Sequence, residues 1–430
     1  MAQPSRGTLR APAGAGAAPR PDAPRRPAAR TVGRSQDDVR RHNLSVLLSA
    51  VHRDGPLTRA QLTGALGLSR STVGDLVGGL AEAGLVHEGR PRAAAGRGVG
   101  RPSLVVTPRE RSATVLALYL DVHWLRAAVV GLGGAVLERG TVQVPSEAPP
   151  DRVAALAGDL AARLVPEAAD RARLVGAGVA VPGTVRAGAG VVGLAPNLGW
   201  VEQPVGEQVA GELEARLGRG LAVAVGNDAD LGVLAECRRG AARDTADVVY
   251  LCGTWGLGGG VVSGGHRLTG SRGFAGEVGH IGVDPEGRPC HCGSRGCWEA
   301  ETSAAAWAAP LDVDPEAPDV AERLLERLDR GGVAARRTRE RVSRSFARGL
   351  ASVVNVLDPH VVLVGAGLWR DLWPVVEDDV LPWVERLVLP ALRGHVDVRL
   401  AGLGADSTLV GAAELALAPL LDDPLALAPA

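Results

Sequence analysis

The chain of 430 residues contains no lysine, so all 47 of its basic residues are arginines. Without lysine the chain cannot form a phosphate-binding P-loop, whose Gly-Lys-Ser/Thr segment requires that residue. No apolar run approaches the roughly 18–20 residues that a membrane-spanning helix needs, so no membrane partner is expected. The five cysteines give no paired disulfide framework and suit a reducing compartment, which predicts a cytoplasmic protein.

The first 34 residues lack a continuous apolar segment and consist mainly of alanine, proline, glycine and arginine. A secretory signal needs such a segment, so we do not interpret this stretch as one. Its composition predicts a disordered tail. A transit peptide is a weaker alternative, because the tail has no convincing amphipathic pattern.

The net charge of −1 hides an asymmetry along the chain. Residues 1–110 contain 17 arginines against 8 acidic residues, whereas the remainder contains 30 arginines against 40 acidic residues. A basic front joined to an acidic body favours a nucleic-acid contact at the front and a different ligand in the body. The length and a hydrophobic content of 46% allow two or three domains with real cores.

Residues 35–110 have the pattern of a small helical domain with a wing. An apolar stripe at helical spacing predicts a first helix that ends before Gly55. Thr58 is a good N-cap for a short second helix, Gly67 supplies a tight turn, and Ser69 caps a third helix. The sequence therefore predicts a helix-turn-helix, followed by two strands at residues 85–87 and 104–106.

In a helix-turn-helix, the first residues of the second helix face base edges in the major groove of DNA. Here those residues are Ser69, Arg70, Ser71 and Thr72. The glycine-rich tip between the two wing strands carries further arginines, and we expect Arg97 and Arg101 to contact phosphates or a minor groove. A double-stranded DNA operator is thus the predicted partner. The alternative is a small protein-interaction domain with a solvated basic loop.

A dense group of metal-binding residues lies between residues 277 and 299. Four candidate ligands lie within eighteen residues, among glycines that allow tight turns: His280, Cys290, Cys292 and Cys297. Three thiolates and one imidazole complete a tetrahedral zinc ion and leave no position for a catalytic water, so the predicted zinc is structural. The alternative is a redox or disulfide cluster. Glu277 and Glu299 flank the group and become candidate ligand-binding carboxylates.

Beyond residue 112, short buried strands alternate with helices. Apolar strands are predicted at residues 115–121, 174–181, 221–225, 247–251 and 360–364, and a long amphipathic helix at 336–357. A hairpin followed by alternating helices and strands occurs twice, which predicts an α/β fold of two similar lobes around a cleft. Ligands of open α/β sheets bind where the strand ends converge.

The body resembles the ROK family (repressors, open reading frames, kinases), and the front module resembles the winged helix-turn-helix of that family's regulators. The segments that carry the resemblance are Val181-Pro-Gly183, Pro196-Asn-Leu-Gly-Trp200, Gly226-Asn-Asp-Ala229, Glu277-Val-Gly-His280, the cysteine segment 290–299, and the segment 358–367. The resemblance implies the duplicated actin-like, sugar-kinase fold over residues 112–420. Lobe 1 would take residues 112–230 plus the C-terminal helix, and lobe 2 residues 231–404.

The resemblance also assigns roles to particular residues. It implies a sugar pocket lined by Asn197, Asn227, Asp228, Glu277, His280 and Glu299. In an active kinase, Asp228 would be the base that deprotonates the phosphorylated hydroxyl. His280 would bind zinc through one ring nitrogen and offer the other to the sugar. Without the resemblance, the Asn227-Asp228 pair after a strand would be interpreted as an ordinary helix cap.

The phosphate-binding loops depart from the pattern of the family's kinases. The first loop is normally Asp-x-Gly-Gly-Thr, but here His123 and Trp124 replace the small residues and Leu125 replaces the hydroxyl. A bulky ring is a steric objection where phosphate must approach backbone N–H groups. In the second loop Trp255 aligns with the hydroxyl position, although an alignment with one inserted residue puts Thr254 there.

An intact sugar half and an altered phosphate half behind a DNA-binding module predict a sugar-responsive transcriptional regulator. We expect a homodimer or homotetramer, because helix-turn-helix proteins pair on half-sites. One alternative is an ATP-dependent hexose kinase with a fused DNA-binding domain. Another is a regulator controlled by a protein partner. ATP would be a cofactor only in the kinase.

Overall fold

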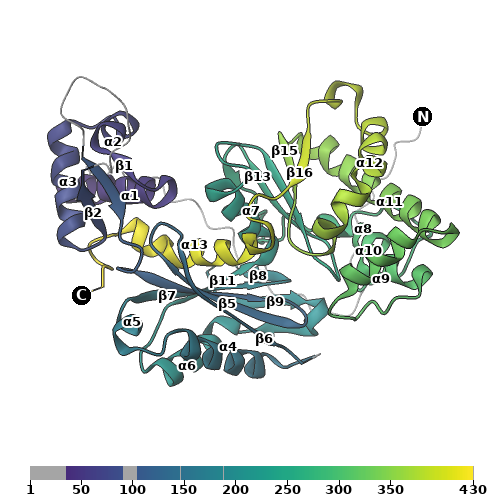
Figure 1. Ribbon diagram of the computed structural model, residues 1–430, viewed down its shortest axis with the longest axis horizontal. Helices are drawn as coiled ribbons and strands as arrows, with labels where there is room; N and C mark the ends of the chain where they lie inside the picture. Colours follow the sequence, from purple (N-terminus) through teal and green to yellow (C-terminus); the bar gives the residue numbers. More distant parts are fainter. Residues whose placement is uncertain (1–34, 91–103, 146, 187, 430) are drawn as a thin grey trace, which may run out of the picture.

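The computed structural model describes residues 35–90, 104–145, 147–186 and 188–429. The predicted tail of residues 1–34 lies outside these ranges, as do Arg97 and Arg101 of the predicted wing. The described chain forms an N-terminal module and two α/β lobes (Figure 1). Within it, no helix combines the length and apolar character needed to cross a membrane.

The N-terminal module contains three helices and a three-stranded sheet. Its elements are α1 (Gln36–Asp54), β1 (Leu57–Thr58), α2 (Arg59–Leu66), α3 (Arg70–Glu82), β2 (Val86–Gly89) and β3 (Val105–Pro108). Thr58 and Ser69 cap α2 and α3 as predicted, each accepting a hydrogen bond from a backbone N–H three residues on. Gly67 between these helices has a φ of 64°, which favours glycine. The wing is larger than predicted, because β1 joins it in the order β1-β3-β2.

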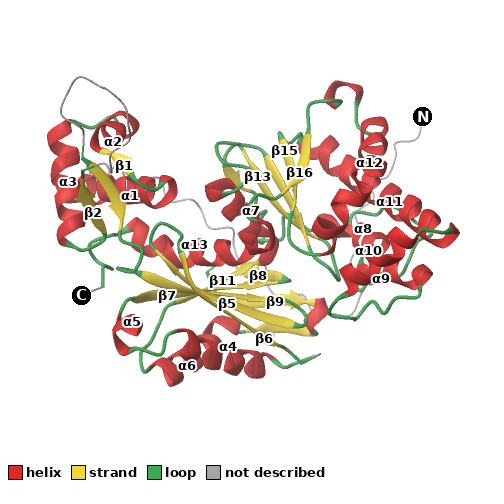
Figure 2. Ribbon diagram, viewed as in Figure 1, coloured by secondary structure: helices red, strands yellow, loops and turns green. Residues whose placement is uncertain are grey.

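Lobe 1 is built on a five-stranded sheet with the order β11-β7-β4-β5-β6. The strands are β4 (Thr114–Leu120), β5 (Trp124–Gly131), β6 (Val136–Gln143), β7 (Leu174–Val181) and β11 (Val223–Asn227). α4 (Pro150–Leu164) and α6 (Val205–Leu217) cover one face, and α13 (Ser407–Asp422) covers the other (Figure 2). Around this sheet lie α5 (Ala168–Ala172), β8 (Thr184–Arg186), β9 (Val191–Ala195), η1 (Pro196–Leu198) and β10 (Trp200–Gln203).

Lobe 2 repeats the five-stranded plan in the order β14-β13-β12-β15-β16. Its strands are β12 (Val248–Cys252), β13 (Gly258–Ser263), β14 (His266–Arg267), β15 (Val361–Val364) and β16 (Asp397–Leu400). Its helices are α8 (Trp298–Thr302), α9 (Ala304–Ala308), α10 (Val320–Arg330), α11 (Val333–Leu357) and α12 (Leu368–Leu387). Single 3-10 turns are η2 (Val278–His280), η3 (Ala309–Leu311), η4 (Pro390–Leu392) and η5 (Gly404–Asp406). The predicted fold class, α/β with two similar lobes, is confirmed.

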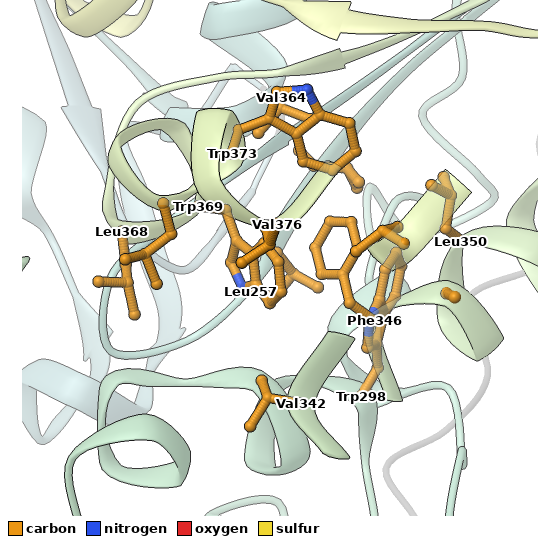
Figure 3. Packing of buried hydrophobic residues seen from close by; sticks show 14 of the residues in the cluster. Leu257, Trp298, Val342, Phe346, Leu350, Val364, Leu368, Trp369, Trp373 and Val376 are labelled. Carbon is orange, nitrogen blue, oxygen red and sulfur yellow. The ribbon is translucent and has the colours of Figure 1, made fainter. Parts of the chain in front are cut away.

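An aromatic core holds the helices of lobe 2 together (Figure 3). The ring of Phe346 on α11 stacks on that of Trp369 on α12, with 3.7 Å between ring centroids. Trp298 is fully buried and also packs against Phe346, with 5.3 Å between ring centroids. Because Trp298 directly follows Cys297, the end of the cysteine loop is fixed to this core.

α7 (Asp228–Arg239) lies between the two lobes and packs against α13. The backbones approach so closely that a Cβ on Gly411 would stand 1.9 Å from the carbonyl oxygen of Leu231. α13 in turn shares one hydrophobic core with the N-terminal module, in which Leu47 and Leu80 meet Leu417. The module is therefore packed on lobe 1 rather than tethered to it.

Candidate functional site

A cavity of about 300 Å³ opens between the lobes, at the ends of β4, β11 and β12. Its polar half brings together all six residues predicted for the sugar: Asn197, Asn227, Asp228, Glu277, His280 and Glu299. Its aromatic half is lined by His123 and Trp255. Strand ends from both sheets meet here, which is why segments far apart in sequence contribute to one site.

Asn227 ends β11 and caps α7, so the helix-cap interpretation describes its structural role. Its side-chain oxygen accepts a hydrogen bond from the Asp230 N–H at 3.0 Å. Its side-chain nitrogen donates to the Gly183 carbonyl oxygen at 3.0 Å. Both bonds hold the amide rigidly at the cavity wall, where its remaining lone pair and N–H can face a ligand.

Asp228 begins α7 and is 7% exposed. Burial is the largest influence on its carboxyl group and raises its pKa to about 7. The hydrogen bond from the Ala229 N–H opposes this rise, while the charges of Asp121 and Glu277 add to it. A carboxyl group with this pKa can accept or release a proton near neutral pH, as a general base must, and it can equally accept a ligand hydroxyl.

Asp121 and Asp230 also line the cavity, and neither was among the predicted site residues. Asp230 pairs with Arg267 of β14, so α7 is tied to lobe 2. Burial raises the pKa of Asp230 to about 6, and Arg267 lowers it in opposition. The pairing of helix α7 with β14 could only be found from the structure, because the strand itself is two residues long.

Glu299 and Asn197 approach each other across Gly256. A Cβ at Gly256 would lie 2.9 Å from Glu299 Oε2 and 3.3 Å from Asn197 Nδ2. Glu277 lies on the side of His280 away from Glu299, with its Oε2 3.8 Å from His280 Nε2. Burial raises the pKa of Glu277, the charge of His280 lowers it, and that of Glu299 raises it further. Because Gly256 has no side chain, Glu299 and Asn197, which come from different lobes, can both reach a ligand in the cavity.

The histidine and the three cysteines form a compact cluster beside the polar half. Their ligand atoms all lie within 4.8 Å of one another: His280, Cys290, Cys292 and Cys297. Cys290 Sγ is 3.7 Å from His280 Nδ1, and Cys292 Sγ is 3.6 Å from Cys297 Sγ. Both distances match the edges of a tetrahedron with metal–ligand bonds of about 2.1–2.3 Å. An S–S bond is about 2.05 Å, and all five cysteines are free. The cluster could therefore hold a metal ion.

Glu301 is a further buried carboxylate that positions the cysteine loop, and sequence reasoning missed it. Its side chain accepts a hydrogen bond from the Arg288 N–H at 2.5 Å, two residues before Cys290. Arg341 of α11 lies 3.9 Å from the same carboxylate. In the sequence, Glu299 was singled out as the acidic residue of the Cys-Trp-Glu segment, and Glu301 was not. Glu301 contacts the cysteine loop only because α8 turns its side chain toward that loop.

The aromatic half is occupied by two rings that meet across the lobes. The imidazole of His123, which follows β4, contacts the indole of Trp255, which follows β12, edge-on at 5.1 Å between centroids. His123 Nε2 is 3.6 Å from a carboxylate oxygen of Glu316, also in lobe 2. The rings therefore connect the lobes by contact at this side of the cavity.

The four residues at the start of α3 lie together on the N-terminal module. Ser69, Arg70 and Ser71 are exposed, and Thr72 is half-buried. The Ser69 hydroxyl is shared with Ser71 and Thr72 through contacts of 2.8 and 2.9 Å. Arg70 is exposed and forms no ion pair with the described residues.

Most of the chain is similar to known proteins. The sequence model of the ROK family matches residues 116–418. A glucokinase of Streptomyces coelicolor is 33% identical over 69% of this chain and 95% of its own length. The xylose repressor of Bacillus subtilis is 23% identical over 90% of this chain and 98% of its own length.

Solved structures agree with this assignment. The structure of a ROK family transcriptional regulator, described as a homologue of the E. coli MLC protein, superposes with a TM-score of 0.71 at 25% identity, covering 90% of this chain and 98% of that one. A ROK family glucokinase from Streptomyces griseus, in complex with glucose and AMPPNP, superposes with a TM-score of 0.58 at 27% identity, covering 71% and 99%. The family match spans well over half of the described fold and its cleft, and the chain therefore belongs to the ROK family.

Proposed function

We propose that this protein is a sugar-responsive DNA-binding transcriptional regulator that represses carbohydrate metabolism genes. The observation that carries the proposal is the contrast within one cavity, where six polar groups line one half and the His123–Trp255 contact fills the other. The repressor and regulator relatives extend over the N-terminal module, whereas the glucokinases match the body alone.

In this proposal the polar half recognises sugar hydroxyls. Glu277, Glu299 and Asp228 would accept hydrogen bonds from hydroxyls, and the amides of Asn197 and Asn227 would donate and accept. Sugars present several donors and acceptors, so a site built from fixed polar groups discriminates against analogues that leave those groups unpaired. D-xylose and D-glucose are the first candidates, because the relatives are a xylose repressor and glucokinases.

We further propose that the metal of the cysteine cluster is zinc with a structural role. Three cysteines and one histidine suit a tetrahedral zinc ion and leave no open position. His280 would ligate through Nδ1, because that nitrogen lies on the side of Cys290. Its Nε2 would remain available to the sugar. A bound zinc would fix the wall that carries Glu277, His280 and Glu299.

The N-terminal module, residues 35–110, would act as a winged helix-turn-helix. The start of α3 would enter the major groove, with Arg70 reading a base edge and Ser69, Ser71 and Thr72 contacting bases or phosphates. Arg97 and Arg101 would contact the DNA backbone or minor groove. A dimer or tetramer would place two modules about 34 Å apart, one helical turn of DNA. Such a protein would act in the cytoplasm.

The test is operator binding measured with and without sugar. An operator fragment selected from random DNA with the wild-type protein would be titrated in the presence of D-xylose, D-glucose or neither. We expect one sugar to change the operator Kd, and Glu277→Ala to abolish that change while leaving the sugar-free Kd unaltered. An unchanged Kd with every sugar, or a full response in Glu277→Ala, would overturn the proposal.

A sugar kinase is the second candidate, because the pKa of about 7 for Asp228 suits a general base. We propose that the chain does not act as a kinase, since His123 and Trp255 stand where phosphate would approach the loops. A coupled assay with ATP and hexoses tests this directly. Turnover that disappears in Asp228→Asn would establish the kinase instead.

A further inference from the structure

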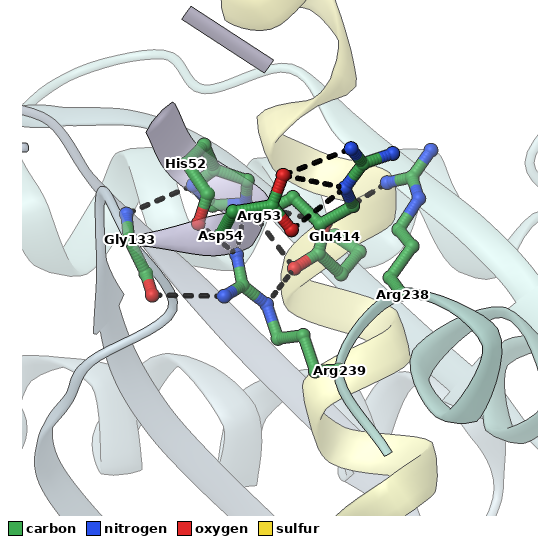
Figure 4. Close-up of polar contacts among 7 residues, drawn as sticks. All are labelled: His52, Arg53, Asp54, Gly133, Arg238, Arg239 and Glu414. Atoms are coloured by element: carbon green, nitrogen blue, oxygen red, sulfur yellow. Dashed lines mark hydrogen bonds and ion pairs between the residues drawn. The ribbon is translucent and has the colours of Figure 1, made fainter. Parts of the chain in front are cut away.

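A buried polar network joins the N-terminal module to lobe 1, far from the cavity (Figure 4). His52, in the last turn of α1, and Glu414 of α13 are each 2% exposed at their side chains. His52 Nε2 lies 3.2 Å from Glu414 Oε1, and the Gly133 N–H donates to His52 Nδ1 at 2.8 Å. Nδ1 therefore acts as an acceptor, and Nε2 faces both the Glu414 carboxylate and the guanidinium of Arg239, whose Nη2 is 2.5 Å away.

The last two residues of α7 complete this network. Arg239 donates to the His52 carbonyl oxygen at 3.0 Å, to the Gly133 carbonyl oxygen at 2.9 Å, and to Glu414. Arg238 donates to Glu414 Oε2 at 2.9 Å. A Cβ at Gly134 would lie 2.5 Å from Arg239 Cζ, so the β5–β6 turn needs glycine to admit this guanidinium. One arginine therefore contacts the module, the β5–β6 turn and α13 together.

The charges of the network favour a single arrangement. Burial by itself raises the pKa of Glu414, but the hydrogen bond from His52 and the charges of Arg239 and Arg238 outweigh it and hold the pKa well below its usual range. Burial lowers the pKa of His52, against the influence of Glu414. An ionised, buried Glu414 requires its arginines, because an unpaired buried charge is strongly unfavourable.

α7 also reaches the cavity at its other end. Asn227 caps the helix and Asp228 is its first residue, so twelve residues, about 18 Å at 1.5 Å per residue, separate the polar half from the network. Near its start α7 touches lobe 2 as well, through the Asp230–Arg267 pair and through Gly260, where a Cβ would stand 2.2 Å from the Ala229 carbonyl oxygen. α13 runs beside α7, from Thr408 at the Asp228 carbonyl oxygen to Leu417 in the core shared with the module.

α7 is packed rigidly against α13, because their backbones are in direct contact and share a buried carboxylate. Glu236 of α7 is fully buried and accepts hydrogen bonds from the Gly402 and Leu403 N–H groups and from the Ser407 hydroxyl. Thr408 donates to the Asp228 carbonyl oxygen at 3.2 Å. This close packing leaves little room for local adjustment if the cavity end of α7 is displaced.

We propose that α7 is the mechanical link between sugar and DNA, and that Arg239, with Glu414 and His52, converts its displacement into a new angle of the N-terminal module. This inference rests on the proposed function and names the regulation of that site. Arg239, Glu414 and His52 are positioning residues, because none of them lines the cavity or lies on the DNA-reading helix. The module would pack on lobe 1 in two ways, one with sugar bound and one without. These arrangements would differ in which hydrogen bonds of the network are kept.

The first experiment measures coupling between the two ligands in the full-length protein. The operator Kd is determined with and without saturating D-xylose or D-glucose, and the Kd of the same sugar with and without operator, since coupling must be reciprocal. In Arg239→Gln we expect the coupling factor to fall at least about fivefold, with the sugar Kd of the DNA-free protein unchanged. Arg238→Gln, at the more exposed arginine, should lose part of the coupling. This second variant keeps the test decisive if Arg239→Gln does not fold.

The matched control is Arg243→Gln. Arg243 pairs with Asp54 at the same boundary, 2.6 Å apart, but it follows α7 and its side chain is 44% exposed. Removing an exposed ion pair of this kind should leave the coupling factor within about twofold of wild type. Equal coupling in wild type, Arg239→Gln and Arg243→Gln would overturn the inference while leaving the proposed function standing.

The second experiment needs no sugar and separates the two failures. Asp230→Asn, Arg239→Gln and the double variant are compared for operator affinity alone. The two sites are about 13 Å apart along α7, a distance at which unlinked substitutions are additive. We expect a departure from additivity of about threefold or more. Additive effects would overturn the inference. In the first experiment, a wild-type operator Kd that changes with neither sugar would instead count against the proposed function.

Discussion

The polar half and the aromatic half of the cavity differ in what holds their side chains. In the polar half, three of the six groups are held by local contacts: Asn227 by the cap of α7, Asp228 by burial, and His280 by the cysteine cluster. In the aromatic half, Trp255 packs against the core of lobe 2 and contacts His123 across the boundary of the lobes. A rigid wall opposite a contact between lobes suits a site that detects a ligand by changing how the lobes meet.

The largest expected effect follows from disrupting the cysteine cluster, which supports the polar half of the cavity. Cys297→Ser should remove the bound metal and lower the free energy of unfolding by at least about 3 kcal/mol, since a structural metal contributes its binding energy to folding. Metal analysis and thermal melting measure both outcomes. Cys237→Ser, outside the cluster on α7, is the control and should retain the metal. A metal-free Cys297→Ser with unchanged stability would show that the wall needs no metal.

The next effect sharpens the polar half itself. Glu277→Gln should weaken sugar binding about 10–100-fold, because a hydrogen bond to a charged group contributes roughly 1.5–3 kcal/mol. Calorimetric titration with D-xylose or D-glucose measures the change. Glu286→Gln, an exposed position outside the cavity, should bind as the wild type does. An unaffected Kd in Glu277→Gln would remove this residue from the site.

A pH effect is expected from Asp228, whose pKa of about 7 is raised above its ordinary value. The ionised carboxylate is the better acceptor for a hydroxyl, so sugar affinity should rise about tenfold from pH 6 to pH 8. Asp228→Asn should flatten that dependence.

The same shift acts on stability with the opposite sign. Because the folded chain holds this proton more tightly than the unfolded chain, the contribution of Asp228 to stability is present below pH 4 and is lost as the pH rises through 7. Denaturation of the sugar-free protein and of Asp228→Asn at pH 5 and pH 8 compares the two. Identical pH dependence in both proteins would contradict the assignment.

The smallest effect tests the aromatic half. Replacing Trp255 and His123 together by glycine should open the space beside the loops and permit weak binding of an ATP analogue, in the millimolar range or about 4 kcal/mol. Ligand-observed NMR detects binding of this strength. Trp307→Phe, in the lobe 2 core and away from the cavity, should bind no nucleotide. Failure of the opened variant to bind would mean that more than these two rings excludes the nucleotide.

Much of this arrangement could be predicted locally. The caps at Thr58 and Ser69 and the turn at Gly67 depend on neighbouring residues alone, and the structure has them where the sequence placed them. The spacing of Cys290, Cys292 and Cys297 predicted a shared centre, and the short loop permits few alternatives. The β1 strand of the wing was missed, because two residues carry no periodicity.

The sequence by itself determined the alternation of strands and helices, the helix caps and the chemistry of the metal-binding residues, because each depends on contacts within a few residues. Only the tertiary structure decided that His123 meets Trp255, that Glu301 holds the cysteine loop, and that Arg239 reaches His52. Those contacts join residues far apart in the chain, and packing of whole helices and sheets sets their distances. α7 illustrates both cases. Its N-terminal cap could be predicted from Asn227-Asp228, whereas the contact of its last residue, Arg239, with His52 was decided by the fold.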